Sequence, residues 1–282
     1  MSTATSAWPV LGCDVTSSPT RRKPVVVALG HVREQHGTGV VALDAVHRFD
    51  NLQDWAVFLH QPMAWVGGFD LPFGLPRELV QTLGWPTDWS ACMAHYAALE
   101  RAQIREQFAA FCDARPVGGK FAHRATDRPA GSSPSMKWVN PPVAYMLHAG
   151  VPWLRRAGVH LPGLHQGDPQ RVALEAYPGL LARELLGNTS YKSDDKAKQT
   201  PERLLARRAL LGALERGQTR LGLRLSASQA LMERLADDAS GDALDATLCL
   251  MQAAWAWQQH ETGHPRYGLP ECDPLEGWIV TA

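Results

Sequence analysis

The 282 residues of this protein fit one large domain or two modest ones. Hydrophobic residues make up 45% of the chain and charged residues 20%, which is typical of a folded globular protein and excludes wholesale disorder. Because 28 Lys and Arg balance 28 Asp and Glu, no overall charge draws the chain to nucleic acid or membrane, so a polyanionic partner would have to bind local patches.

The first 70 residues predict three strands, a helix and a fourth strand. Apolar or β-branched runs occupy 9–15, 25–29 and 40–43. The short polar connections between these runs favour an antiparallel meander. Helical spacing of apolar residues follows over 51–61, where Asn51 is placed to cap the helix, and strand character returns over 63–69, ending at Asp70. Hairpin strands followed by a helix and another strand predict a mixed sheet.

Residues 76–170 interrupt this pattern and predict a helical insertion. A long helix fits 89–113, and two short helical pieces are expected within 142–158. Between them, 114–142 is rich in Gly, Pro, Ser and basic residues. This loop is longer than passive connections usually are, so we expect it to have a role of its own.

The rest of the chain predicts one more strand and then helices. The strand pattern resumes over 172–176. One helix is expected to start at Thr200, which a proline follows, and the next at Ser226, which forms a capping box with Gln229. A last helix is expected over about 240–260.

The cysteines and the apolar segments indicate the compartment. The five cysteines are widely spaced and form no Cys-x-x-Cys pair, which argues against a disulfide framework and a structural zinc site. No apolar run approaches the ~20 residues needed to cross a bilayer, and the first 15 residues lack the basic and apolar regions of a secretion signal. We therefore expect a reduced, cytoplasmic enzyme that has no membrane partner.

Five acidic residues stand out by their positions: Asp14 and Asp70 end predicted strands, Glu175 lies within an apolar strand, and Asp242 and Asp245 stand at the start of the last helix. Asp242 and Asp245 are three residues apart and share one face of a helix. A carboxylate in an apolar strand is costly unless it is paired, hydrogen-bonded or bound to a metal, and carboxylates suit Mg²⁺ or Mn²⁺. The order of these residues predicts a convergent acidic cluster that binds one of these ions.

Each acid also has a simpler interpretation. Asp14 or Asp70 alone could cap backbone N–H groups of a turn, and Asp242 could complement the dipole of its helix. Glu175 could pair with an arginine. The cluster is absent only if every one of these separate interpretations is correct. Because that combination is demanding, the cluster is favoured.

These acids resemble those of the ribonuclease H-like fold, which places an Asp on its first strand, an acid at the end of its fourth and an Asp on its last helix. More closely, the chain resembles the family called "domain of unknown function 429", regarded as predicted nucleases. The pieces that match are Gly12-Cys13-Asp14, Phe69-Asp70-Leu71-Pro72-Phe73-Gly74-Leu75, Glu175-Ala176-Tyr177-Pro178, Lys198-Gln199-Thr200-Pro201-Glu202, Asp242-Ala243-Leu244-Asp245-Ala246 and Glu276-Gly277-Trp278-Ile279. They imply an α/β fold over residues 1–282, a single domain with a mixed five-stranded sheet flanked by helices and an insertion at about 76–170.

The resemblance implies a metal-dependent nuclease that hydrolyses DNA or RNA. Two Mg²⁺ or Mn²⁺ ions roughly 4 Å apart would flank the phosphodiester. Asp14 would be the central ligand, and the other four acids compete for the remaining positions. One departure is that Val15 follows the first-strand Asp, where many relatives of this fold carry Gly.

Two basic stretches could bind phosphate. Residues 115–137 contain five Lys and Arg against one acid, and 192–224 contain nine against four. Such contacts give affinity that is independent of sequence, although both stretches could be ordinary solvated surface. The candidate contacts are Arg124, Arg128, Lys137 and Lys192, with Trp138 and Tyr145 as candidates for stacking on bases.

Other functions are weaker candidates. His260-Glu261-Thr262-Gly263-His264 matches the zinc-protease pattern, but Gly263 and the following proline predict that the helix ends there. An ATP-dependent phosphotransferase shares the same core fold, yet neither Asp14 nor Asp70 is followed directly by Gly. A non-catalytic nucleic-acid-binding scaffold is the third class. The polymer that is bound and the oligomeric state stay open.

Overall fold

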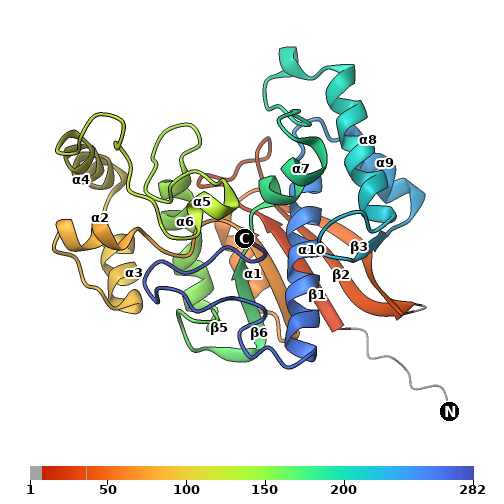
Figure 1. The fold of residues 1–282 in the computed structure, drawn as a ribbon, viewed down its shortest axis with the longest axis horizontal. Helices are drawn as coiled ribbons and strands as arrows, with labels where there is room; N and C mark the ends of the chain where they lie inside the picture. Colours follow the sequence, from red (N-terminus) through yellow and green to blue (C-terminus); the bar gives the residue numbers. More distant parts are fainter. Residues whose placement is uncertain (1–7, 36) are drawn as a thin grey trace.

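The computed structural model describes residues 8–35 and 37–282, which form an α/β fold around one seven-stranded mixed sheet (Figure 1). The strands are β1 (Trp8–Asp14), β2 (Val25–Gln35), β3 (Thr38–Phe49), β4 (Trp65–Asp70), β5 (Val159–His160), β6 (Asp168–Glu175) and β7 (Arg224–Ser226). The helices are α1 (Leu52–Leu59), α2 (Arg77–Thr82), α3 (Trp89–Ala98), α4 (Arg101–Asp113), α5 (Asp127–Ala130), α6 (Val143–Arg156), α7 (Pro178–Leu186), α8 (Pro201–Glu215), α9 (Gln229–Asp237) and α10 (Asp242–Glu261), with a 3₁₀ helix at Lys196–Lys198.

The strand order β5-β6-β4-β1-β2-β3-β7 confirms the mixed sheet and corrects the expected number of strands. β1, β2 and β3 pair antiparallel as the predicted meander, and the other pairs are parallel. The five expected strands are the five central ones. The prediction missed β5 and β7, which have two and three residues and are too short to show a strand period.

The helices fill both faces of the sheet and depart from expectation in three places. The predicted helix 89–113 is two helices, because the backbone is extended at Leu99 and a capping box at Glu100 starts α4. The two pieces expected at 142–158 form one helix, α6. Ser228 caps α9, and Ser226, the expected cap, ends β7 instead.

One buried core lies on each face of the sheet. Alternating residues of β1 separate them, because Val10 faces the core that contains α8 and α10, and Leu11 faces the core that contains α1, α3, α4 and α6. In Figure 1 the helices of the 76–170 segment gather on one side, whereas α7, α8 and α9 lie on the other and α10 runs beside β1. In the described parts of the chain, no helix combines the length and apolar character that a bilayer crossing requires.

Two glycines let α10 approach the centre of the sheet. Gly12 of β1 and Gly68 of β4 are paired in register. A Cβ on Gly12 would overlap backbone atoms of Ala246 and Leu250, and a Cβ on Gly68 would overlap the carbonyl oxygen of Cys249. The helix therefore packs its backbone against the two strands at this point, two residues before each strand ends.

Gly12→Ala is expected to lower the free energy of unfolding by about 3 kcal/mol, because the added methyl group meets backbone that cannot rotate away. Urea unfolding measures the change. Gly119→Ala is the matched control, since its nearest neighbour would be the carbonyl oxygen of Pro116 at 3.5 Å, and it is expected to stay within about 0.5 kcal/mol of the parent protein. Equal stability of the two variants would contradict the close approach of α10.

Candidate metal centre

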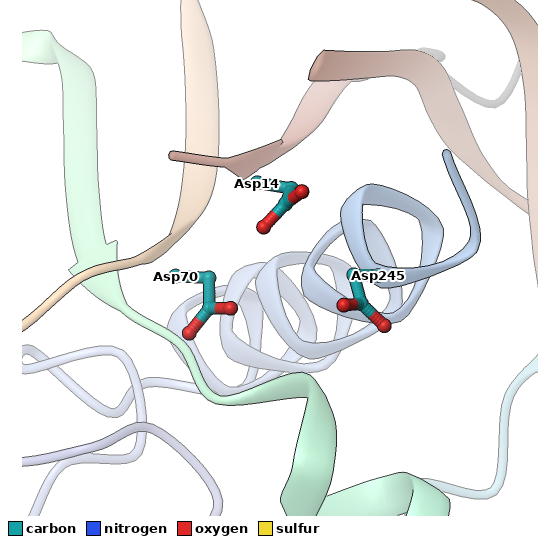
Figure 2. A group of neighbouring side chains, drawn as sticks. All are labelled: Asp14, Asp70 and Asp245. Atoms are coloured by element: carbon teal, nitrogen blue, oxygen red, sulfur yellow. The ribbon is translucent and has the colours of Figure 1, made fainter. Parts of the chain in front are cut away.

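Three carboxylates from three elements meet at one end of the sheet. Asp14 and Asp70 are the last residues of β1 and β4 and are paired in register, while Asp245 lies in the first turn of α10. Each offers one oxygen, and these oxygens lie within 4.8 Å of one another. Figure 2 shows the three side chains gathered where the two strands end above the helix. The close packing of α10 at Gly12 and Gly68 brings Asp245 to the strand ends.

Asp14 and Asp70 do not serve as turn caps. Among the residues that the structure describes, neither carboxylate accepts a hydrogen bond from a backbone N–H. Both side chains are partly accessible to solvent, whereas Asp245 is fully buried. The two strand-end carboxylates are therefore free to accept an incoming cation.

Asp245 is held by Tyr191 and Lys192, which lie between α7 and the 3₁₀ helix. The hydroxyl of Tyr191 donates to Oδ1 of Asp245, and Nζ of Lys192 donates to Oδ2. The Lys192 side chain is 41% exposed, so the buried carboxylate has a partner whose side chain is partly in solvent.

Asp242 is a fourth carboxylate beside the three. Its side chain is 1% exposed, and Oδ1 accepts a hydrogen bond of 2.9 Å from Nζ of Lys23. Its Oδ2 is buried and has no hydrogen-bond partner within residues 8–35 and 37–282. These four carboxylates face the two ammonium groups of Lys23 and Lys192, and Lys23 also pairs with Asp194 at 2.8 Å, so the carboxylates outnumber the ammonium groups. Buried charge of this kind is costly unless a cation balances it.

The crowding of these groups changes their protonation. Burial, followed by the charge of Asp245, raises the pKa of Asp14 well above its usual range. The same two causes raise the pKa of Asp70 to about 7, and burial also raises the pKa of Asp245 although Lys192 opposes it. Burial lowers the pKa of the Lys192 ammonium, but the carboxylates of Asp245 and Asp14 outweigh it and the pKa lies well above its usual value.

We expect the metal-free protein to lose stability as the pH rises toward 8. The pKa of Asp70 is near 3.8 in the unfolded chain and about 7 in the fold, so its stabilising proton is fully present below pH 4 and is lost as the pH passes 7. Asp70→Asn should therefore be more stable than the parent protein in EDTA at pH 8, on the order of 3 kcal/mol after screening by water, and equally stable below pH 4. Urea unfolding at both pH values tests this, with Asp113→Asn, an exposed residue, as the unchanged control.

Glu175 lies near the three carboxylates but is committed to another partner. It is 4% exposed and accepts hydrogen bonds from Nη1 and Nη2 of Arg124 at 2.7 and 2.6 Å and from the backbone N–H of Phe73 at 2.9 Å. Arg124 also donates to Asp127 at 2.9 Å and is 2% exposed. The pairing of Glu175 with an arginine is therefore the interpretation that the structure supports. The guanidinium N–H groups of Arg124 donate to partners inside the protein.

The other candidate phosphate contacts lie in different settings. Arg128 is exposed, Lys137 is partly exposed, and Lys192 alone touches an acid of the centre. Lys23 and Tyr191 were missed from the sequence. Lys23 follows two arginines in a polar turn, and nothing in that local pattern indicates that it pairs with Asp242, 219 residues away.

The donor set fits a hard divalent cation. It consists of carboxylate oxygens from Asp14, Asp70 and Asp245, and the neighbouring Asp242 has a buried oxygen without a partner in the described residues. Oxygen ligands of this type favour Mg²⁺ or Mn²⁺. No protein-family model, curated protein or solved structure matches this chain.

Proposed function

We propose that the protein is a metal-dependent phosphodiesterase, a nuclease that hydrolyses DNA or RNA. The observation that carries the proposal is the meeting of Asp14, Asp70 and Asp245 from two parallel strand ends and the last helix. These are the positions at which the ribonuclease H-like fold, which the sequence resembles, places its acids. The five central strands, β6-β4-β1-β2-β3, support the same resemblance.

Asp14, Asp70 and Asp245 would hold Mg²⁺ or Mn²⁺, and Asp242 is close enough to raise the pKa of Asp14. Such ions supply a water nucleophile at neutral pH and stabilise the oxygen that leaves the phosphorus. Tyr191 orients the Asp245 carboxylate through its hydroxyl. Fixing a ligand in this way supports affinity for the metal, because the carboxylate loses less freedom on binding.

Lys192 would compensate the charge of the substrate phosphate. It lines two cavities, and Asp70 lines both of them as well. Once a cation neutralises Asp245, Lys192 is free to interact with a phosphate oxygen, and phosphate contacts of this kind carry no sequence preference. Arg128 and Lys137 are further candidates, whereas the buried Arg124 acts within the fold.

The test uses purified protein with labelled single-stranded, duplex and branched DNA and RNA, in Mg²⁺, Mn²⁺ or EDTA. We expect cleavage with either metal and none in EDTA. A parallel assay measures ATP turnover. The proposal is contradicted if no substrate is cleaved in either metal, or if cleavage persists in EDTA. ATP turnover without cleavage favours the phosphotransferase.

A further inference from the structure

Two cavities flank Asp70 and share part of their walls. One has a volume of about 310 Å³ and the other about 320 Å³. Asp70, Tyr177 and Lys192 line both. Asp70 therefore places one carboxylate of the candidate metal centre at both cavities.

The two cavities are lined by different residues. Five apolar side chains, Leu71, Pro72, Val143, Met146 and Ile279, line the first, which we call the apolar cavity, together with the paired Arg124 and Glu175. Arg183 and the loop residues Asn188, Thr189 and Ser190 line the second, which we call the polar cavity, together with Pro178 and Ala182. An apolar cavity binds the flat face of an aromatic group, whereas a polar cavity with a cation binds sugar hydroxyls and phosphate.

Tyr177 lines both cavities and is held by several contacts. The guanidinium group of Arg183 donates to the Tyr177 hydroxyl at 3.1 Å, lies 5.2 Å from the centre of its ring and donates to the carbonyl oxygen of Ala130 at 2.5 Å. The backbone N–H of Tyr177 donates to Gln252 of α10 at 3.1 Å. Tyr177 is thus held directly by α10 and, through Arg183, by the 76–170 segment.

We propose that the substrate is single-stranded nucleic acid, with one unstacked base in the apolar cavity and the adjoining sugar and phosphate in the polar one. This inference rests on the proposed function and names its substrate. The apolar cavity, at about 310 Å³, is near the lower end of the size range of ligand sites, and we assign a single base to it. A base can present its face to such a wall only when it has left the stack, and a single strand loses little stacking on entry.

Binding is measured by fluorescence anisotropy in EDTA, where no cleavage is expected. The probes are labelled 12-mers of oligo(dT), the same strand in a duplex, and a chain of abasic residues with equal charge. Oligo(dT) is expected to bind the parent protein about tenfold or more tightly than either of the others, which is the contribution of roughly one stacked base. Oligo(U) is measured in parallel, and a preference for either sugar identifies the polymer.

Met146→Trp fills the apolar cavity and is expected to remove the advantage of oligo(dT) over the abasic chain. Val57→Trp, at a residue of α1 that is 68% exposed, is the control and should keep that advantage. The comparison of probes on the parent protein needs no variant, so a misfolded Met146→Trp does not affect it. The inference is overturned if the parent protein binds the abasic chain or the duplex as tightly as it binds oligo(dT). It is also overturned if Met146→Trp keeps the preference for oligo(dT) over the abasic chain.

A separate substrate distinguishes this inference from the function on which it rests. Methyl p-nitrophenyl phosphate is a phosphodiester without a nucleobase. If the parent protein hydrolyses it in Mn²⁺ and not in EDTA while binding is independent of bases, the substrate assignment fails and the phosphodiesterase stands. If binding depends on bases but the parent protein hydrolyses methyl p-nitrophenyl phosphate in neither Mg²⁺ nor Mn²⁺, the substrate assignment stands and the phosphodiesterase proposal fails.

Discussion

Asp14→Asn is expected to reduce metal-dependent cleavage by roughly 10³-fold or more, because loss of an outer partner of a metal ligand already costs 10- to 100-fold. Asp14 ends β1, the central strand of the sheet, with Asp70 beside it in register and Asp245 of α10 within reach of both. The amide is isosteric but carries no charge, so it removes a ligand without opening space. Initial rates in Mg²⁺ and Mn²⁺ measure the effect.

Stability supplies an independent readout of the same variant. In EDTA Asp14→Asn should be at least as stable as the parent protein, since burial and the neighbouring Asp245 disfavour the charge that it removes. Saturating Mn²⁺ should stabilise the parent protein and have a much smaller effect on the variant. Asp113→Asn changes an exposed acid at the end of α4 and should leave both rate and stability unchanged. Parent-like cleavage by Asp14→Asn would exclude the carboxylate centre as the catalytic site.

Arg124→Met is expected to lower the free energy of unfolding by roughly 3–5 kcal/mol at pH 8. The guanidinium group is paired with Glu175 and Asp127, which are 4% and 0% exposed, and it also donates to the carbonyl oxygen of Glu276 at 3.1 Å. Its removal leaves two buried carboxylates without their counter-ion. This network ties the loop at 114–142 to β6 and to the last residues of the chain.

The loss caused by Arg124→Met should shrink as the pH falls. Burial already raises the pKa of Glu175 against the opposing charge of Arg124, and without that charge the pKa rises further. The folded carboxyl then holds a proton at higher pH than the unfolded one, so the variant regains stability toward pH 4. Arg124→Met combined with Glu175→Gln should recover part of the loss at pH 8. Arg105→Met, at an exposed position of α4, is the control and should change stability by less than about 0.5 kcal/mol. A loss that is equal at pH 8 and pH 4 would contradict the ionic origin.

Local patterns predicted much of the framework. The five central strands, the first helix with its Asn51 cap and the start of α8 after Thr200 lie where the apolar spacing and capping residues indicate. The break between α3 and α4 was missed, because apolar spacing continues across Leu99 while the capping box at Glu100 is read only from its contacts. β5 and β7 depend on pairing with longer neighbours and have no period of their own.

Sequence reasoning by itself determined that Asp14 and Asp70 end strands, because strand ends follow from local apolar runs and the residues that terminate them, but it placed Glu175 inside the strand that it ends. The tertiary structure alone decided how those acids are used. Glu175 and Arg124 are 51 residues apart and Asp245 and Lys192 are 53 apart, so no local pattern relates the partners. The close packing of α10 on Gly12 and Gly68 brings Asp245 to Asp14 and Asp70. The physical reason is that a charge in a buried site pairs with whatever opposite charge the packing delivers, and packing is a property of the whole chain.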